Sequence, residues 1–258
     1  MKTKKILLVA SLVLMVGIVA CKKDHEIPTG KVFNSETGGD TIVPGGDDNH
    51  EYVDLGLPSG TLWAACNLGA KSPEGYGSYY AWGETTTKEN YAWASYKYAK
   101  GNSWDDPRLT KYCNDPDYGN IGFSDVLNTL LPEDDAATIN WGRNWCMPTK
   151  DQWQELLDNT SVRETIQNGV HGRLFTAENG NMLFLPASGY RWGNVQSDIG
   201  NKGYYWSSTL SSSSPIDACF LSFYSNHCYV VDGTLRIWGR TIRPVRSAGP
   251  KNNMSVSI

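Results

Sequence analysis

The residues Asn181-Met-Leu-Phe-Leu-Pro-Ala-Ser-Gly-Tyr190 begin the stretch that decides the fold of this chain. Three further runs follow: Gly203-Tyr-Tyr-Trp-Ser-Ser208, Ala218-Cys-Phe-Leu-Ser-Phe223 and Gly239-Arg-Thr-Ile-Arg-Pro-Val-Arg246. Each run is short and rich in aromatic or branched residues, and clusters of Gly, Ser, Asn and Pro separate them. This pattern is typical of β-strands joined by turns. The sequence therefore predicts that residues 181–246 form the closing half of a β-rich domain.

Turn signals place further strands and loops before this stretch. Glu178-Asn-Gly180 lies between two apolar runs, 172–176 and 181–185, and predicts a hairpin. Pro58-Ser-Gly60 predicts a turn between two short strands within 51–66. Residues 85–125 lack periodicity and predict a long ordered loop region. Its Asp-rich segment 114–119 raises the alternative of a calcium loop, but the twelve-position pattern is missing, which favours simple turns.

Two segments predict helices. The first, 132–139, starts with Pro132, and its three following carboxylates, Glu133, Asp134 and Asp135, suit the positive end of a helix dipole. The second, 149–158, has a capping box from Thr149 to Gln152 and an apolar face made by Trp153, Leu156 and Leu157. Helices combined with a β-rich second half predict an α+β fold.

The N-terminus predicts export. Lys2, Lys4 and Lys5 precede an apolar run that is too short to span a bilayer, which is typical of a signal peptide over residues 1–20. The run ends Ile18-Val-Ala-Cys21 and resembles a bacterial lipobox, so we expect lipidation of Cys21 and attachment to the membrane through its acyl chains. The alternative is a plain signal peptide. Gly-rich, weakly apolar residues 21–50 predict a flexible tether, and the polar residues 247–258 predict a loose tail.

Charge and cysteine content limit the function classes. Loss of the three leader lysines would reduce the 23 basic residues to 20, against 27 acidic residues. An acidic chain argues against nucleic acid as a partner. No cysteine or histidine spacing predicts a metal site, and no cofactor motif is present. Cys219 and Cys228 flank a predicted turn, and the sequence leaves open whether they form a disulfide.

Several motifs in a fixed order resemble a known family. They are Tyr52-Val-Asp-Leu-Gly-Leu57, Leu62-Trp-Ala-Ala-Cys-Asn-Leu-Gly-Ala70, Tyr79-Tyr-Ala-Trp-Gly-Glu84, Leu109-Thr-Lys-Tyr-Cys113, Pro132-Glu-Asp-Asp-Ala-Ala137, Trp145-Cys-Met-Pro-Thr149, Phe184-Leu-Pro-Ala-Ser-Gly-Tyr190, Tyr204-Tyr-Trp-Ser-Ser208 and Ile242-Arg-Pro-Val245. The chain resembles the Fibrobacter succinogenes major paralogous domain, which is abundant in surface lipoproteins of Bacteroidota. Lys22-Lys-Asp-His-Glu26 resembles the surface-display signal of such lipoproteins.

The resemblance implies a C-type-lectin-like domain over residues 51–246, with a small twisted antiparallel β-core, two helices and long ordered loops. It also implies an outer-membrane location and a ligand face built from the late loops and strands. In this chain that face would comprise Tyr190, Arg191, Trp192, Trp206, Tyr224, Asn226, His227, Tyr229, Arg236 and Trp238. Aromatic rings and adaptable polar groups of this kind suit a glycan or protein ligand. The alternative is that about half of the aromatic residues, especially Trp206 and Trp238, belong to the core.

An enzyme and an assembly subunit are the two alternatives to a ligand-binding protein. An enzyme related to the formylglycine-generating enzymes would need a pair of nearby cysteines, but the surroundings of Cys219 and Cys228 do not match such a site. No nucleophile elbow, phosphate loop or zinc-protease motif is present. We therefore expect no catalytic residues. The sequence leaves open an acid pair for glycoside cleavage, because its two carboxylates would meet only in three dimensions. A structural or assembly subunit of a surface complex is the other alternative, and an exposed edge strand would support it.

Overall fold

The computed structural model describes residues 50–247, which form an α+β fold dominated by strands. The predicted signal peptide, Cys21, and most of the predicted tether and tail lie outside the described residues. No helix within the described part of the chain is long and apolar enough to cross a membrane.

The elements follow one another in an order that places almost all strands late. The first half holds β1 (Tyr52–Asp54), β2 (Thr61–Ala64) and four 3-10 helices, at Trp93–Ser95, Pro116–Tyr118, Asn120–Gly122 and Pro132–Asp134. Two α-helices follow, α1 (Ala136–Trp141) and α2 (Lys150–Asp158). The remaining strands are β3 (Thr160–Gln167), β4 (Val170–Ala177), β5 (Met182–Pro186), β6 (Tyr190–Trp192), β7 (Val195–Ser197), β8 (Lys202–Leu210), β9 (Asp217–Tyr224), β10 (His227–Leu235) and β11 (Val245–Ser247).

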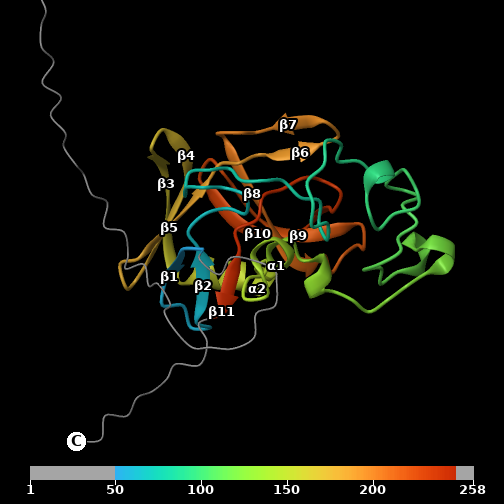
Figure 1. The fold of residues 1–258 in the computed structure, drawn as a ribbon, viewed down its shortest axis with the longest axis horizontal. Coiled ribbons are helices and arrows are strands. Elements are labelled where there is room, and N and C mark those ends of the chain that lie inside the picture. Colours follow the sequence, from blue (N-terminus) through green and yellow to red (C-terminus); the bar gives the residue numbers. More distant parts are fainter. Residues whose placement is uncertain (1–49, 248–258) are drawn as a thin grey trace, which may run out of the picture.

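These strands form small antiparallel sheets. Their orders are β1-β2-β11, β3-β4-β5, β10-β9-β8 and the two-stranded β6-β7. The pairing of β11 with β2 brings the end of the domain back to its beginning. In Figure 1 the β6–β7 hairpin lies at the top, α1 and α2 lie near the lower centre, and the segment 85–125 with its 3-10 helices extends to the right, away from β3–β5.

The β10-β9-β8 sheet separates two hydrophobic clusters. On one face, Tyr205, Leu221 and Phe223 pack in a cluster that includes Trp153 of α2, and α2 contacts all three strands. On the other face, Trp206 and Phe220 belong to a second cluster that includes the aromatic residues of 79–112 except the exposed Trp104. Alternating side chains on opposite faces of each strand make this two-sided packing possible.

Several sequence predictions are confirmed. The Thr149 hydroxyl accepts a hydrogen bond from Gln152 N, and the Gln152 side chain accepts one from Thr149 N, which completes the capping box of α2. The hairpin around Glu178–Gly180 joins β4 to β5, and the Pro58–Gly60 turn joins β1 to β2. The Asp115 side chain caps a 3-10 helix by accepting a hydrogen bond from Asp117 N, which agrees with the turns predicted over 114–119.

Other predictions need correction. The helix expected over 132–139 is divided, because Asp135 leaves the helical conformation and caps α1, which starts at Ala136. Strand β3 was not predicted, because its less exposed positions include Thr160, Thr165 and Gln167 while Ile166 is 59% exposed, so the sequence shows no apolar alternation. Asp134 does lie in the first turn of a helix, the 3-10 helix Pro132–Asp134, but its buried carboxylate is held mainly by two tyrosines and two lysines.

That cluster around Asp134 fixes the long segment 85–125 to the start of the helical region. Lys111 Nζ lies 2.5 Å from one Asp134 oxygen, the Tyr112 hydroxyl donates to the same oxygen at 2.7 Å, and Lys97 Nζ lies 3.1 Å from the other oxygen. The Tyr98 hydroxyl also donates to Asp134. Asp134 is only 2% exposed. Burial alone would raise the pKa of its carboxyl, but the hydrogen bonds from Lys111, Tyr98, Tyr112 and Lys97 outweigh burial and lower the pKa to about 2.

The depressed pKa predicts an acid-dependent contribution to stability. The contribution is complete above the pKa of about 4 that an unfolded Asp has, and it is lost as the pH falls towards 2. We expect Asp134→Asn to lower the free energy of unfolding by about 2 kcal/mol at neutral pH, and this difference should shrink below about pH 4. Chemical denaturation as a function of pH measures both effects.

Glu133→Gln is the matched control, because Glu133 also pairs with Lys111 but its side chain is 62% exposed. An exposed ion pair contributes under about 1 kcal/mol. Equal losses in the two variants, or a loss in Asp134→Asn that does not depend on pH, would contradict the assignment.

Candidate functional site

The face of the β10-β9-β8 sheet that is turned away from α2 carries an ordered array of side chains. Residues directly opposite one another on antiparallel strands share a face, as do residues two apart on one strand. The strand register therefore sets nine side chains in three rows across β8, β9 and β10: Lys202–Tyr224–His227, Tyr204–Ser222–Tyr229 and Trp206–Phe220–Val231.

The three rows pass from the core to the surface. Trp206 is completely buried and Phe220 is 6% exposed, so this row belongs to the core. Tyr204 and Tyr224 are half-buried, whereas Tyr229 is 41% exposed. The sheet thus holds a rigid core at one end and presents tyrosine rings to solvent at the other.

Rings from outside the sheet extend this surface. The ring centroids of Tyr190 and Tyr204 lie 5.4 Å apart, and those of Tyr190 and Trp238 lie 5.2 Å apart. At the β9–β10 turn, the Tyr224 ring lies 5.3 Å from His227 and 6.2 Å from Tyr229. We name the resulting surface the aromatic face; its residues are Tyr190, Tyr204, Tyr224, His227, Tyr229 and Trp238.

Polar groups border the aromatic face. The Tyr204 hydroxyl donates to Asp198 at 3.3 Å, and Lys202 forms an ion pair with the same carboxylate at 3.2 Å. The hydroxyl oxygens of Tyr224 and Tyr229 lie 3.3 Å apart. Burial and the nearby Asp198 carboxylate raise the pKa of Tyr204, so its hydroxyl stays protonated at neutral pH. The face therefore offers ring surfaces together with hydroxyl, carboxylate and ammonium groups.

Two of the predicted ligand-binding residues are in the core. Trp206 and Arg236 have no exposed surface, so they are not available to a ligand in this structure. Trp206 donates its indole N–H to the carbonyl of Tyr80 at 2.8 Å. Arg236 donates to the Tyr96 hydroxyl and to three main-chain carbonyls. The prediction that Trp206 and Arg236 belong to a ligand face is therefore corrected, because both satisfy buried polar groups.

The other predicted residues lie in different places. Tyr190, Tyr224, His227, Tyr229 and Trp238 come together in the aromatic face. Trp192 is 51% exposed at the end of β6, and Asn226 is exposed in the β9–β10 turn. Arg191 alternates with Tyr190 and Trp192 along β6, and its guanidinium lies 5.5 Å from the ring of Tyr79, away from the aromatic face.

Tyr204, Lys202 and Arg240 were missed in the sequence. The spacing of two between Lys202, Tyr204 and Trp206 is a signal that could have placed them on one face. Arg240 gives no such signal, because it reaches the aromatic face from a segment outside the sheet. Its guanidinium carbon lies 4.8 Å from the Tyr204 ring centroid and 5.8 Å from that of Trp238.

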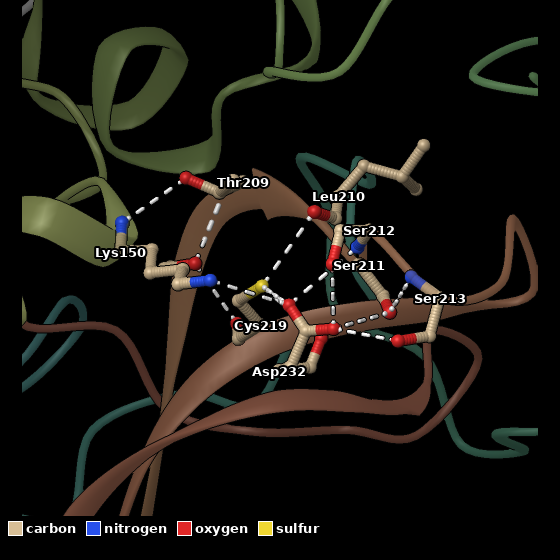
Figure 2. Close-up of polar contacts among 9 residues, drawn as sticks. Lys150, Thr209, Leu210, Ser211, Ser212, Ser213, Cys219 and Asp232 are labelled. Carbon is tan, nitrogen blue, oxygen red and sulfur yellow. Dashed lines mark hydrogen bonds and ion pairs between the residues drawn. The ribbon is translucent and has the colours of Figure 1, made fainter.

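A second polar cluster surrounds Asp232, at the irregular position of β10 (Figure 2). The hydroxyls of Ser212 and Ser213 lie 2.9 and 2.8 Å from Asp232 Oδ2, and that of Ser211 lies 3.4 Å away. Lys150, at the start of α2, lies 3.4 Å from Oδ1. Burial would raise the pKa of Asp232, but the hydrogen bonds from these serines and from Cys219 lower it below its usual range.

This cluster forms one wall of a cavity of about 580 Å³, whose other polar residues include Asn114, Asn128 and Thr129. The Asp232 carboxylate already accepts from several donors, so its first role is to hold the 211–213 loop against β10 and α2. Cys219, which is completely buried, donates to the carbonyl of Asp232 at 3.1 Å.

The cysteines of the described region are all free. Cys228 is opposite Phe223, four residues along β9 from Cys219, which corresponds to about 13 Å and exceeds disulfide reach. The Cys219–Cys228 disulfide that the sequence left open is therefore absent from this structure. Burial raises the pKa of both thiols to about 12, which disfavours the reactive thiolate at neutral pH.

Within residues 50–247, no group of three or more His, Cys, Asp or Glu side chains is placed to hold a metal ion. Comparison with known proteins finds no matching family model, no matching curated protein and no matching solved structure.

The Asp232 cluster predicts a local stability effect. Asp232→Asn keeps the shape of the side chain but places an NH₂ group against some of the surrounding donors. We expect the free energy of unfolding to fall by about 1–2 kcal/mol at neutral pH, since hydrogen bonds to a charged group are lost. Asp151→Asn is the matched control, because Asp151 borders the same cavity and is exposed. Urea denaturation that shows no difference between the two variants would contradict the role given to Asp232.

Proposed function

We propose that this chain is an outer-membrane lipoprotein, anchored through Cys21 and exposed on the cell surface, that binds a glycan or protein ligand. In this proposal, residues 51–246 form a C-type-lectin-like domain of the Fibrobacter succinogenes major paralogous type. The small antiparallel sheets, the two helices and the long segment 85–125 support this assignment. The aromatic face is the ligand-binding surface, and the protein acts by binding rather than by catalysis.

The observation that carries the proposal is that partly exposed rings from β6, β8, β9, β10 and Trp238 gather on one side of the β10-β9-β8 sheet. Large rings supply contact area at a low cost in conformational entropy, because they have few rotatable bonds. Here the strand register and ring-to-ring packing fix Tyr204, Tyr224 and Tyr229 before any ligand binds. Tyrosine and tryptophan on such preorganised surfaces dominate many binding interfaces.

Strand β10 supports a second candidate, an assembly subunit. Among the described residues, no strand or isolated bridge pairs with the outer edge of β10. An open edge of this kind can accept a strand from another protein. The irregular pairing between Val231 and Thr234 interrupts this edge, however, and such bulges discourage strand addition. We therefore favour ligand binding over an assembly role.

Binding to glycan and host-protein arrays tests the first proposal. The purified full chain is compared with Tyr224→Ala/His227→Ala/Tyr229→Ala. We expect at least about tenfold weaker binding in the triple variant, because the contact area of two rings and an imidazole is lost. Trp104→Ala is the matched control, since Trp104 is 65% exposed in the 85–125 segment. Binding that survives the triple change but not Trp104→Ala would move the site to that segment. Capture of a partner that depends on the β10 edge would favour assembly.

The anchor makes a separate prediction. Cys21→Ser removes the thiol that would be acylated, so we expect the protein to leave the membrane fraction and appear in the soluble fraction. Lys22→Ser is the control and should remain with the membrane. A Cys21→Ser protein that still sediments with membranes would show that the lipid-anchor proposal is wrong.

A further inference from the structure

Three arginines are buried within one short segment, and two of them have well-satisfied guanidinium groups. Arg236 donates to the Tyr96 hydroxyl and to the carbonyls of Tyr112, Pro215 and Lys111, each at 2.8 Å. Arg243 donates to the Asn67 side chain and to the carbonyls of Ala64, Ala65 and Phe184, at 2.8 to 3.0 Å. All three nitrogens of each guanidinium therefore have partners, and both arginines have a structural role.

Arg240 differs from these two neighbours. It is 2% exposed, and Nη2 donates to the Thr234 hydroxyl at 3.1 Å, but Nε and Nη1 have no hydrogen-bond partner. Its guanidinium carbon lies 3.8 Å from the Phe220 ring centroid, so one side of the group is stacked on the sheet. Burial lowers the pKa of Arg240 to about 9, and no carboxylate is among the groups that oppose this shift. At neutral pH the side chain still carries its charge.

Folding alone does not account for such an arrangement. Burying a charge is unfavourable unless hydrogen bonds or an opposite charge compensate it, and the surrounding rings compensate it only in part. A methylene-rich side chain would pack against Phe220 without this cost. A buried polar group without a partner needs an explanation, and a water, an ion or a ligand that completes its hydrogen bonds is one.

We infer that Arg240 is a ligand-binding residue of the aromatic face and that the ligand is an acidic saccharide, whose carboxylate or sulfate oxygens pair with Nε and Nη1. This inference rests on the proposed ligand-binding role of that face. A guanidinium offers parallel N–H donors that match the geometry of an oxyanion.

Access to Arg240 depends on two half-buried rings. Tyr204 and Trp238 are the partly exposed aromatic residues nearest to the guanidinium, at 4.8 and 5.8 Å. Rotation of an interface side chain on binding is common, and a change in the Trp238 rotamer would admit an oxyanion. The sugar ring would then lie against the tyrosine rings of the aromatic face.

The charges around the face favour a saccharide over an acidic peptide. Lys202 and Asp198 pair with each other, so Arg240 supplies the positive charge that is not neutralised locally. Asp198 repels a densely anionic chain, but it can accept hydrogen bonds from hydroxyl groups, which saccharides carry. The tyrosine hydroxyls add further partners of the same kind.

The test compares polymers that share one backbone. The purified full chain is titrated calorimetrically with dextran, sparsely carboxymethylated dextran and sparsely sulfated dextran, and with polyglutamate as the acidic-peptide probe. We expect at least one charged dextran to bind tenfold or more tightly than dextran. Arg240→Met should abolish this preference, while Arg240→Lys, which keeps the charge, should retain part of it.

Thermal unfolding separates a binding role from a structural one. Arg240→Met should unfold at the same temperature as the wild type or at a higher one, because an uncompensated buried charge is removed. Arg243→Met, which leaves several carbonyls without donors, should unfold at a clearly lower temperature. A lower unfolding temperature for Arg240→Met, with charge preference intact, would overturn the inference.

The remaining outcomes distinguish this inference from the proposed function. Binding of dextrans that depends on Tyr224 and Tyr229 but shows no preference for charge would overturn the role of Arg240 and leave the aromatic face as the site. Equal or tighter binding of polyglutamate would replace the saccharide by an acidic peptide. Absence of binding to all four polymers would overturn the inference of an acidic saccharide, while the array experiment would still decide whether the face binds ligands.

Discussion

Hydrogen bonds from two buried arginines to main-chain carbonyls hold the irregular parts of this protein together. A buried carbonyl without a partner costs about as much as a lost hydrogen bond, so segments without regular secondary structure need other donors. Arg236 supplies them to Lys111, Tyr112 and Pro215, and Arg243 supplies them to Ala64, Ala65 and Phe184. One planar guanidinium with several fixed N–H groups can thus join chain segments that are far apart in sequence.

The same logic explains why a long segment with few helices and strands can be well ordered. Asp134 gathers two tyrosine hydroxyls and two lysines, and Arg236 lies against Trp82 and Tyr96, with its guanidinium carbon 5.4 and 5.2 Å from their ring centroids. Aromatic rings bury large areas and also carry a hydroxyl or N–H that can satisfy a carbonyl. Order in the 85–125 segment therefore comes from side-chain packing and side-chain hydrogen bonds more than from backbone ladders.

The β10-β9-β8 sheet joins the hydrophobic core on one face to the proposed ligand-binding surface on the other. One face rests on α2, and the other changes along its length from a buried row to a row with exposed rings. The buried row and the tyrosines belong to the same three strands, so packing of the buried row also holds the tyrosine backbone in place. Within residues 236–243, the two satisfied arginines support the loops, while Arg240 places a charge beneath the aromatic face. In the proposed function, structural and ligand-binding roles are thus divided among chemically identical side chains according to what surrounds them.

The sequence by itself determined the local elements whose signals lie within a few residues. The capping box of α2, the Glu178–Gly180 hairpin and the Pro58–Gly60 turn are examples, because neighbouring residues decide capping and turn geometry. It also indicated the α+β class and five of the residues that meet in the aromatic face. Tertiary structure decided which of two similar rings is buried and which of two buried arginines has a full set of partners. Trp206 and Trp238 read alike in sequence, as do Arg236 and Arg240, but only the fold shows which rings and carbonyls each one meets. Burial and the pairing of a charge depend on segments distant in the chain, and no local pattern contains that information.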